Sequence, residues 1–305
     1  MQAATACGDD RLLVQVRATL GQALAAAGRY APAAVLLNDA ISVKQTHRSG
    51  AGLAVGLAYS LVCKAYILGD RGEFAQAHEC FDSALTTAGA GEHQVGASIR
   101  GWCAAVLLWQ GRWAEAKVMA VQGRRIGERV RSLFTLSMGT SVVAFAEWQL
   151  EPNERALQQM TDTLAWLTPR GNGLFTSLTH GWLAEALVSA GRPAEARQHA
   201  ARALQRGRQL DLIGGAMACR AMARLAASDG HGPHARRWIG RALDIATARG
   251  SAHERATTSL CSAEVELALV RPDLAEPLLD AALAGFEAMR MDWHGERARR
   301  LRLRL

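Results

Sequence analysis

The chain has 305 residues, of which 50% are hydrophobic and only 7 are proline, so it can bury a large core and favours helices. Its net charge of +7 comes almost entirely from arginines spread along the chain, which makes nucleic-acid binding unlikely. No long apolar run marks a membrane span, the first residues lack the pattern of a signal peptide, and the six cysteines form no CxxC pair. We therefore expect a cytoplasmic protein that does not contact a membrane.

A helical hairpin recurs along the chain. The clearest copy has an apolar helix before Gly191, a turn at that glycine, and a second helix with small residues at Ala196 and Ala203. Aligning the turn position gives seven copies, with turns at Gly28, Gly72, Gly111, Glu151, Gly191, Gly230 and Val270. The period of roughly 40 residues indicates a helical repeat in which each hairpin buries its apolar face against its neighbours.

The predicted hairpins cover, in chain order, residues 10–46, 53–88, 94–128, 132–167, 174–208, 212–249 and 253–289. Residues 290–305 follow as a basic tail, in which arginines alternate with leucines. We expect this tail to cap the array and to fray at its end, because the alternation is a poor helical pattern. The sequence thus predicts an all-α solenoid, and we assign residues 1–305 to one repeat domain.

The hairpin resembles the tetratricopeptide repeat in a longer form, through the turn Gly191, the small residues Ala196 and Ala203, and the spacing of Leu183 and Leu187. More narrowly, the chain is similar to the C-terminal repeat region of bacterial signalling proteins that carry an ATPase, such as LuxR-type regulators and adenylate cyclases. The stretches that carry this similarity are 181–196, 249–256, 286–289 and 293–298. The resemblance implies a right-handed superhelix of about seven hairpins that acts through protein–protein interaction in signalling or transcription regulation.

Catalytic motifs are absent from the sequence. It contains no phosphate-binding loop, no nucleophile elbow and no HExxH, and we expect no enzyme activity, cofactor or metal. Aromatic and arginine side chains on the first helices, which would line the concave face, are the candidate binding residues. They are Trp102, Trp109, Phe145, Trp148, Trp182, Arg220 and Arg224.

Packing is the alternative role for some of these side chains. Trp102 and Trp182 occupy the same column of the repeat, which favours a packing role for both. Trp113 and Trp238 lie on second helices, and we expect them between hairpins or on the convex surface.

The main hypothesis is a non-catalytic scaffold, a sensor or adaptor that binds a protein or peptide in its concave groove. The alternative is a sensor domain for a small-molecule effector held inside the superhelix. A helical repeat that binds nucleic acid is a weaker third possibility. The oligomeric state stays open.

Overall fold

The computed structural model describes residues 10–46, 51–89, 93–170, 175–208 and 211–305. Within these ranges the chain forms fifteen α-helices, one 3-10 turn (Thr168–Arg170) and no strand, which confirms the predicted all-α fold. The hairpins are α2 (Asp10–Ala26) with α3 (Tyr30–Thr46), α4 (Ala51–Asp70) with α5 (Phe74–Ala88), α6 (Gln94–Gln110) with α7 (Trp113–Arg129), α8 (Leu133–Leu150) with α9 (Glu154–Leu167), α10 (Thr176–Ser189) with α11 (Pro193–Gly207), α12 (Gly215–Ser228) with α13 (Gly232–Arg249), and α14 (Ala252–Ala268) with α15 (Pro272–Ala288). A last helix, α16 (Asp292–Arg302), follows.

The turns of the hairpins show why the repeat pattern folds as it does. Five of the seven turn positions are glycines with φ between 69° and 86°, a left-handed conformation that glycine adopts without strain. Val270 takes the same conformation at φ 59° in the last hairpin. The fourth turn is built differently: Glu151 is extended, and the side chain of Asn153 accepts a hydrogen bond from the backbone N–H of Ala156 at 3.0 Å.

Small side chains allow the helices to approach closely. The alanine five residues after each turn position has 0% exposure in all seven hairpins: Ala33, Ala77, Ala116, Ala156, Ala196, Ala235 and Ala275. A larger residue at these positions would push the two helices apart, because protein interiors are close-packed. The repeat column identified in the sequence is therefore the packing seam of the solenoid.

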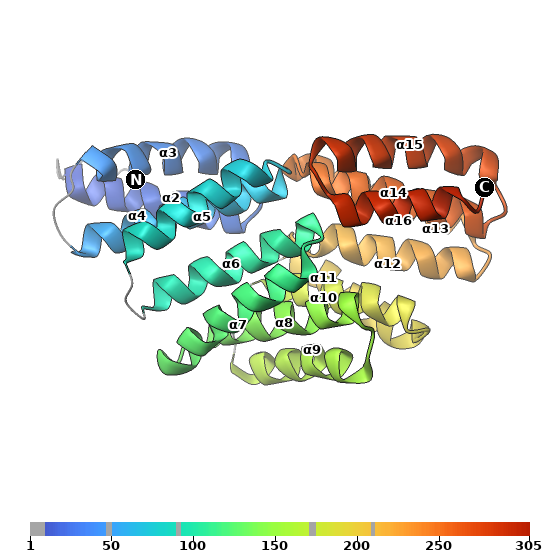
Figure 1. Ribbon diagram of the computed structural model, residues 1–305, viewed down its shortest axis with the longest axis horizontal. Helices are drawn as coiled ribbons and strands as arrows, with labels where there is room; N and C mark the ends of the chain where they lie inside the picture. Colours follow the sequence, from blue (N-terminus) through green and yellow to red (C-terminus); the bar gives the residue numbers. More distant parts are fainter. Residues whose placement is uncertain (1–9, 47–50, 90–92, 171–174, 209–210) are drawn as a thin grey trace.

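The solenoid closes on itself. In Figure 1 the chain runs from α2–α5 through α6–α11 to α12–α16, and the C-terminal helices return to the ends of the first hairpins. The turn glycines of the first three hairpins form this contact, which we call the closure interface. Gly28 lies against Arg249, Gly72 against Met289, and Gly111 against Trp293 and His294. By contrast, a Cβ added at Gly191 or Gly230 would meet nothing within 4 Å.

Asp70, the last residue of α4, lies at the centre of the closure interface with 0% exposure. Its carboxylate accepts hydrogen bonds from Arg249 (Nε at 3.0 Å and Nη2 at 3.2 Å), Ser251 Oγ (2.7 Å), His253 Nε2 (2.9 Å) and the Tyr30 hydroxyl. Burial raises the pKa of Asp70, but Arg249 and the bonds from His253 and Tyr30 outweigh it, and the pKa lies well below its usual range. A buried ion pair thus joins the second hairpin to the sixth and seventh.

The basic tail folds further than its sequence pattern indicates. The helix α16 continues to Arg302, followed by a turn at Leu303, so the expected fraying does not reach the helix. Ala298 is fully buried, and Arg302 forms an ion pair with Asp280 of α15. Packing against the last hairpin therefore overrides the weak local pattern.

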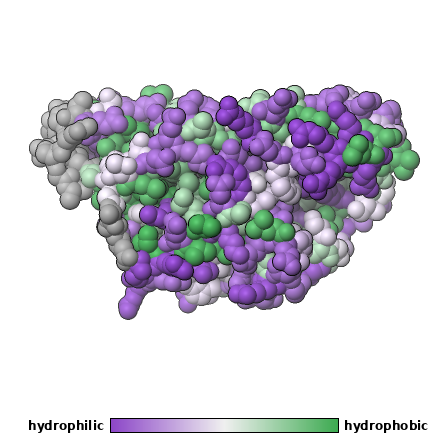
Figure 2. Space-filling view, in the orientation of Figure 1, coloured by the Kyte–Doolittle hydropathy of each residue, from purple (hydrophilic) through white to green (hydrophobic). Residues whose placement is uncertain are grey.

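The outer surface is ordinary for a helical repeat. The face seen in Figure 2 is mainly hydrophilic, with hydrophobic residues in separate groups. Among the described helices, none combines the length and apolar character that a bilayer crossing would need.

Candidate ligand-binding site

A cavity of about 80 Å³ lies in the concave interior, where the closure interface meets the middle hairpins. Its walls come from the first helices α6, α8, α10, α12 and α14, from the start of α7, and from α16. Because the first helix of each of these hairpins faces inward, side chains far apart in the sequence converge on this one space.

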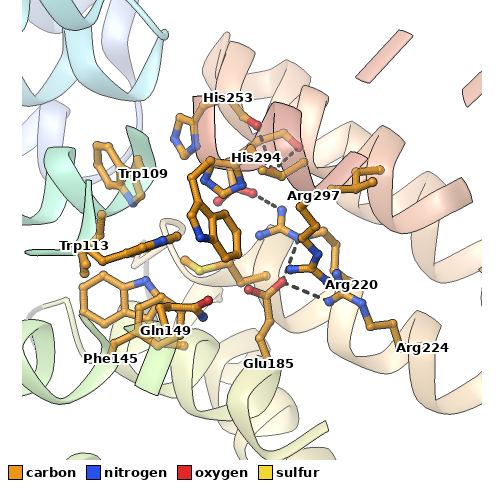
Figure 3. Close-up of a pocket in the computed structure, with 17 residues that line it drawn as sticks. Trp109, Trp113, Phe145, Gln149, Glu185, Arg220, Arg224, His253, His294 and Arg297 are labelled. Atoms are coloured by element: carbon orange, nitrogen blue, oxygen red, sulfur yellow. Dashed lines mark hydrogen bonds and ion pairs between the residues drawn. The ribbon is translucent and has the colours of Figure 1, made fainter. Parts of the chain in front are cut away.

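Aromatic rings form one side of the cavity (Figure 3). Phe145 stacks on Trp182 with ring centroids 5.4 Å apart, and Trp113 meets the edge of Trp293 at 5.0 Å. Such aromatic pairs contribute more than the area they bury. The result is a rigid apolar wall.

Arginines and glutamates form the opposite side (Figure 3). Arg220 bonds to Glu185 at 2.8 Å and also to Glu254, while Arg224 bonds to Glu264 at 2.8 Å. Arg297 of α16 reaches the same Glu264 at 2.6 Å. Arg220, Arg224, Arg297, Glu185 and Glu254 line the cavity, whereas Glu264 is not a lining residue and pairs with Arg224 and Arg297.

The arginines keep the buried glutamates ionised. Burial alone would raise the pKa of Glu185. The positive charges of Arg220 and Arg224 lower that pKa by more than burial raises it, so the net shift is downward. Burial likewise opposes ionisation of Glu264, yet Arg224 and Arg297 bring its pKa to about 2. At neutral pH the charged side of the cavity is therefore a network of paired ions.

Two indole nitrogens of residues that line the cavity have no hydrogen-bond partner: Nε1 of Trp109 and Nε1 of Trp113. Burial and the nearby Arg297 lower the pKa of His294 to about 3, so its imidazole is neutral. Unpartnered polar atoms are rare in folded interiors, and their presence here makes this cavity the candidate binding site.

Five of the seven predicted binding residues line this cavity: Trp109, Phe145, Trp182, Arg220 and Arg224. Trp182 and Phe145 are also buried core residues, so packing and lining are not exclusive roles. That any of the seven contacts a ligand stays a prediction.

The other two predicted residues lie elsewhere. Trp102 lines a second cavity of about 300 Å³ with Tyr66, Phe134 and Phe175. Trp148 lines neither cavity and packs into the hydrophobic core. Phe145 and Gln149, four residues apart on α8, share the inward face of the helix, and Trp148 lies off that face.

Several lining residues were missed by sequence reasoning. Trp113, the first residue of α7, packs between hairpins as one of the two expected alternatives has it, against Phe145 and Trp293, and it also lines the cavity. Trp293, His294 and Arg297 come from the stretch interpreted as a capping tail. His253 is set in place by its bond to Asp70 and stacks on Trp109 at 5.0 Å. Only closure of the solenoid brings these residues together.

No protein-family model and no curated protein matches the sequence. Solved structures do resemble the fold. A Rap protein complexed with Competence and Sporulation Factor has a TM-score of 0.60 and 15% identity, over 88% of this chain and 79% of that one. NprR in complex with its cognate peptide NprX has a TM-score of 0.64 and 12% identity, over 97% and 85%.

A third likeness is weaker. A signal transduction ATPase of the STAND class with a tetratricopeptide repeat sensor, from Pyrococcus horikoshii, has a TM-score of 0.48 and 14% identity, over 82% of this chain and 43% of that one. This similarity is too low to support an argument. The first two likenesses, together with the stacked hairpins, show that the chain has a tetratricopeptide-like helical repeat fold.

Proposed function

We propose that this chain is a non-catalytic cytoplasmic sensor or adaptor that binds a peptide in its concave interior and acts in signalling or transcription regulation. The observation that carries the proposal is the convergence of aromatic rings from α6, α7, α8, α10 and α16 and of arginines from α12 and α16 on one interior space. Helical grooves that bind peptides combine apolar pockets with a few charged contacts in this way.

The similar structures support a peptide as the partner. The NprR structure is a complex with its cognate peptide NprX, and the Rap protein structure is a complex with Competence and Sporulation Factor. This chain matches most of the length of both proteins. Since identity is low, the choice of peptide rests on the residues of this chain alone.

Two interior cavities support this proposal, because each is a place that a peptide side chain could occupy. Tyr66 lines the larger cavity, and its ring lies 6.3 Å from that of Trp109 in the smaller one. An extended peptide would place one side chain in each cavity and its backbone along the inner helices. The interior must widen to admit the backbone, so binding selects a more open arrangement of the hairpins.

A small-molecule effector is the second candidate function. The smaller cavity is bounded by paired charges and holds a group of side-chain size, which also suits a free small molecule. In that case the ligand would bind without a peptide backbone.

A displayed library of random peptides selected on the immobilised full chain tests the proposal. Selected peptides are then synthesised and titrated by calorimetry into the wild type and Arg224→Gln. We expect Arg224→Gln to weaken binding by about tenfold or more, because it removes a desolvated charged contact. The matched control is Arg192→Gln, an exposed arginine paired with Glu195 outside the cavities. Two results would refute peptide binding in the interior. One is failure to select any peptide that outcompetes its scrambled version, and the other is equal affinity of the selected peptides for Arg224→Gln and Arg192→Gln.

A further inference from the structure

The small cavity is lined by Trp109 and Trp113, whose indole N–H groups no protein group satisfies, and we propose that these two donors bind the carboxamide side chain of an asparagine or glutamine. The inference rests on the proposed function, since it names the chemical group that the bound peptide places in this cavity.

The unpartnered atoms require hydrogen-bond acceptors on the ligand. An indole nitrogen only donates, so Trp109 and Trp113 each supply one unused donor. Both side chains are 6% exposed, and Figure 3 shows their rings directed toward the cavity, opposite the arginines. A ligand oxygen that accepts from both N–H groups removes two buried, unsatisfied donors at once.

The charges around the cavity favour an uncharged ligand. Each glutamate is already bonded by an arginine: Glu185 and Glu254 by Arg220, and Glu264 by Arg224 and Arg297. An anionic ligand would therefore face carboxylates and a cationic one would face guanidinium groups, each without a counter-charge of its own. Burying an unpaired charge is costly, whereas a neutral polar group needs only hydrogen bonds.

A carboxamide matches both the donors and the acceptors of the cavity. Its oxygen can accept from the indoles, and its NH₂ can donate to the side-chain oxygens of Gln149 or Glu185, which line the same space. The volume of about 80 Å³ equals roughly five to eight water positions, which fits such a side chain but not a stretch of backbone.

Titration of acetamide into ¹⁵N-labelled full-length protein tests the proposal. The indole N–H resonances report directly on the two donors, and Trp109→Phe and Trp113→Phe assign their peaks. Trp166 and Trp238, which line neither this cavity nor the larger one, are internal controls. Acetate and methylammonium are charged probes of similar size. We expect saturable shifts of the Trp109 and Trp113 peaks with acetamide, and binding of the charged probes that is weaker by about tenfold.

Three outcomes would overturn the proposal. They are the absence of a saturable shift at the two peaks, equal shifts at Trp166 and Trp238, and acetate or methylammonium binding as tightly as acetamide. The proposed function is tested separately by the selected peptides. If those peptides bind in the interior but keep their affinity when asparagine and glutamine are replaced by aspartate and glutamate, peptide binding stands and the carboxamide assignment fails. If acetamide shifts the indoles but no peptide binds, the pocket chemistry stands and the peptide function fails.

Discussion

Replacing Asp70 with asparagine tests whether the buried ion pair holds the solenoid closed. The variant keeps the shape of the side chain but removes the counter-charge of Arg249, which is 1% exposed. The only other carboxylate within ion-pair distance of Arg249 in the described structure is Glu254, at 3.9 Å. The new NH₂ group would also face Ser251 and His253, which donate to the wild-type carboxylate.

The expected cost follows from the burial of the pair. Removing one partner of a buried ion pair lowers the free energy of unfolding by about 3–5 kcal/mol, because the remaining charge is left uncompensated. Urea unfolding followed by far-UV circular dichroism at pH 7 measures this difference. The control Asp39→Asn breaks a half-exposed pair with Arg17 and should cost less than about 1 kcal/mol. A loss for Asp70→Asn as small as that of the control would refute the role of Asp70 in closure.

The same pair predicts the response to acid. The folded pKa of Asp70 lies below its unfolded value of about 3.9, so its contribution is fully present above that pH and is lost as pH falls through the folded pKa. The stability difference between wild type and Asp70→Asn should therefore be constant above about pH 5 and shrink below pH 4. A difference that grows on acidification would contradict this sign.

Three further changes test other parts of the structure. Gly72→Ala should lower the free energy of unfolding by about 2–4 kcal/mol in the same urea assay, because the added Cβ clashes in the closure interface and alanine is strained at positive φ. The control Gly191→Ala adds only the strain and should cost about 1 kcal/mol. Arg220→Met should cost about 3–5 kcal/mol, because it removes the arginine bonded to Glu254, which is 1% exposed, whereas Glu185 keeps Arg224 at 3.4 Å. A loss under about 1 kcal/mol would show that the network is not buried in solution. Burial and nearby positive charge lower the pKa of His180 to about 3 and that of His199 to about 4. The contribution of these two neutral histidines to stability should therefore be full above about pH 6.5 and decline toward pH 4. Replacing both with glutamine should flatten this decline in thermal unfolding.

The hairpins could be predicted from the sequence because their signals are local. A turn glycine with positive φ and a buried alanine five residues later are properties of one hairpin, and they repeat. The position of Gly72 in the closure interface could not be predicted in this way. Which turns meet the last hairpins depends on the summed rotation of all the repeats between them, and no single repeat encodes that sum.

The same limit explains the partial prediction of the site. Trp109, Trp182 and Arg220 lie on inward faces of first helices, and the helical period places them there. Trp113 and His294 enter the cavity only because α16 returns to the turn between α6 and α7. A signal was nonetheless present, since residues 249–256 and 293–298, which carry the resemblance to bacterial signalling proteins, supply Arg249, His253 and Trp293.

The closure interface and the cavity share residues, so we expect closure and the binding of a ligand inside the cavity to be thermodynamically linked. His253 donates to Asp70 and stacks on Trp109, while Glu254 bonds to Arg220 and lies near Arg249.

A variant whose closed form is less populated should therefore bind acetamide in the small cavity more weakly, since the apparent Kd rises in inverse proportion to the competent fraction. This expectation concerns a ligand that fits inside the closed cavity, and not a peptide, for which the interior has to widen. Acetamide titration of folded Asp70→Asn should give a larger Kd than the wild type, although Asp70 does not line the cavity. Small-angle scattering on the same sample should show an increased radius of gyration, because separation of the closure interface extends the solenoid. The hairpins can remain folded when this interface separates, because each still stacks on its neighbours. An unchanged Kd together with an increased radius would show that the cavity forms without closure, and the link between the two would then be wrong.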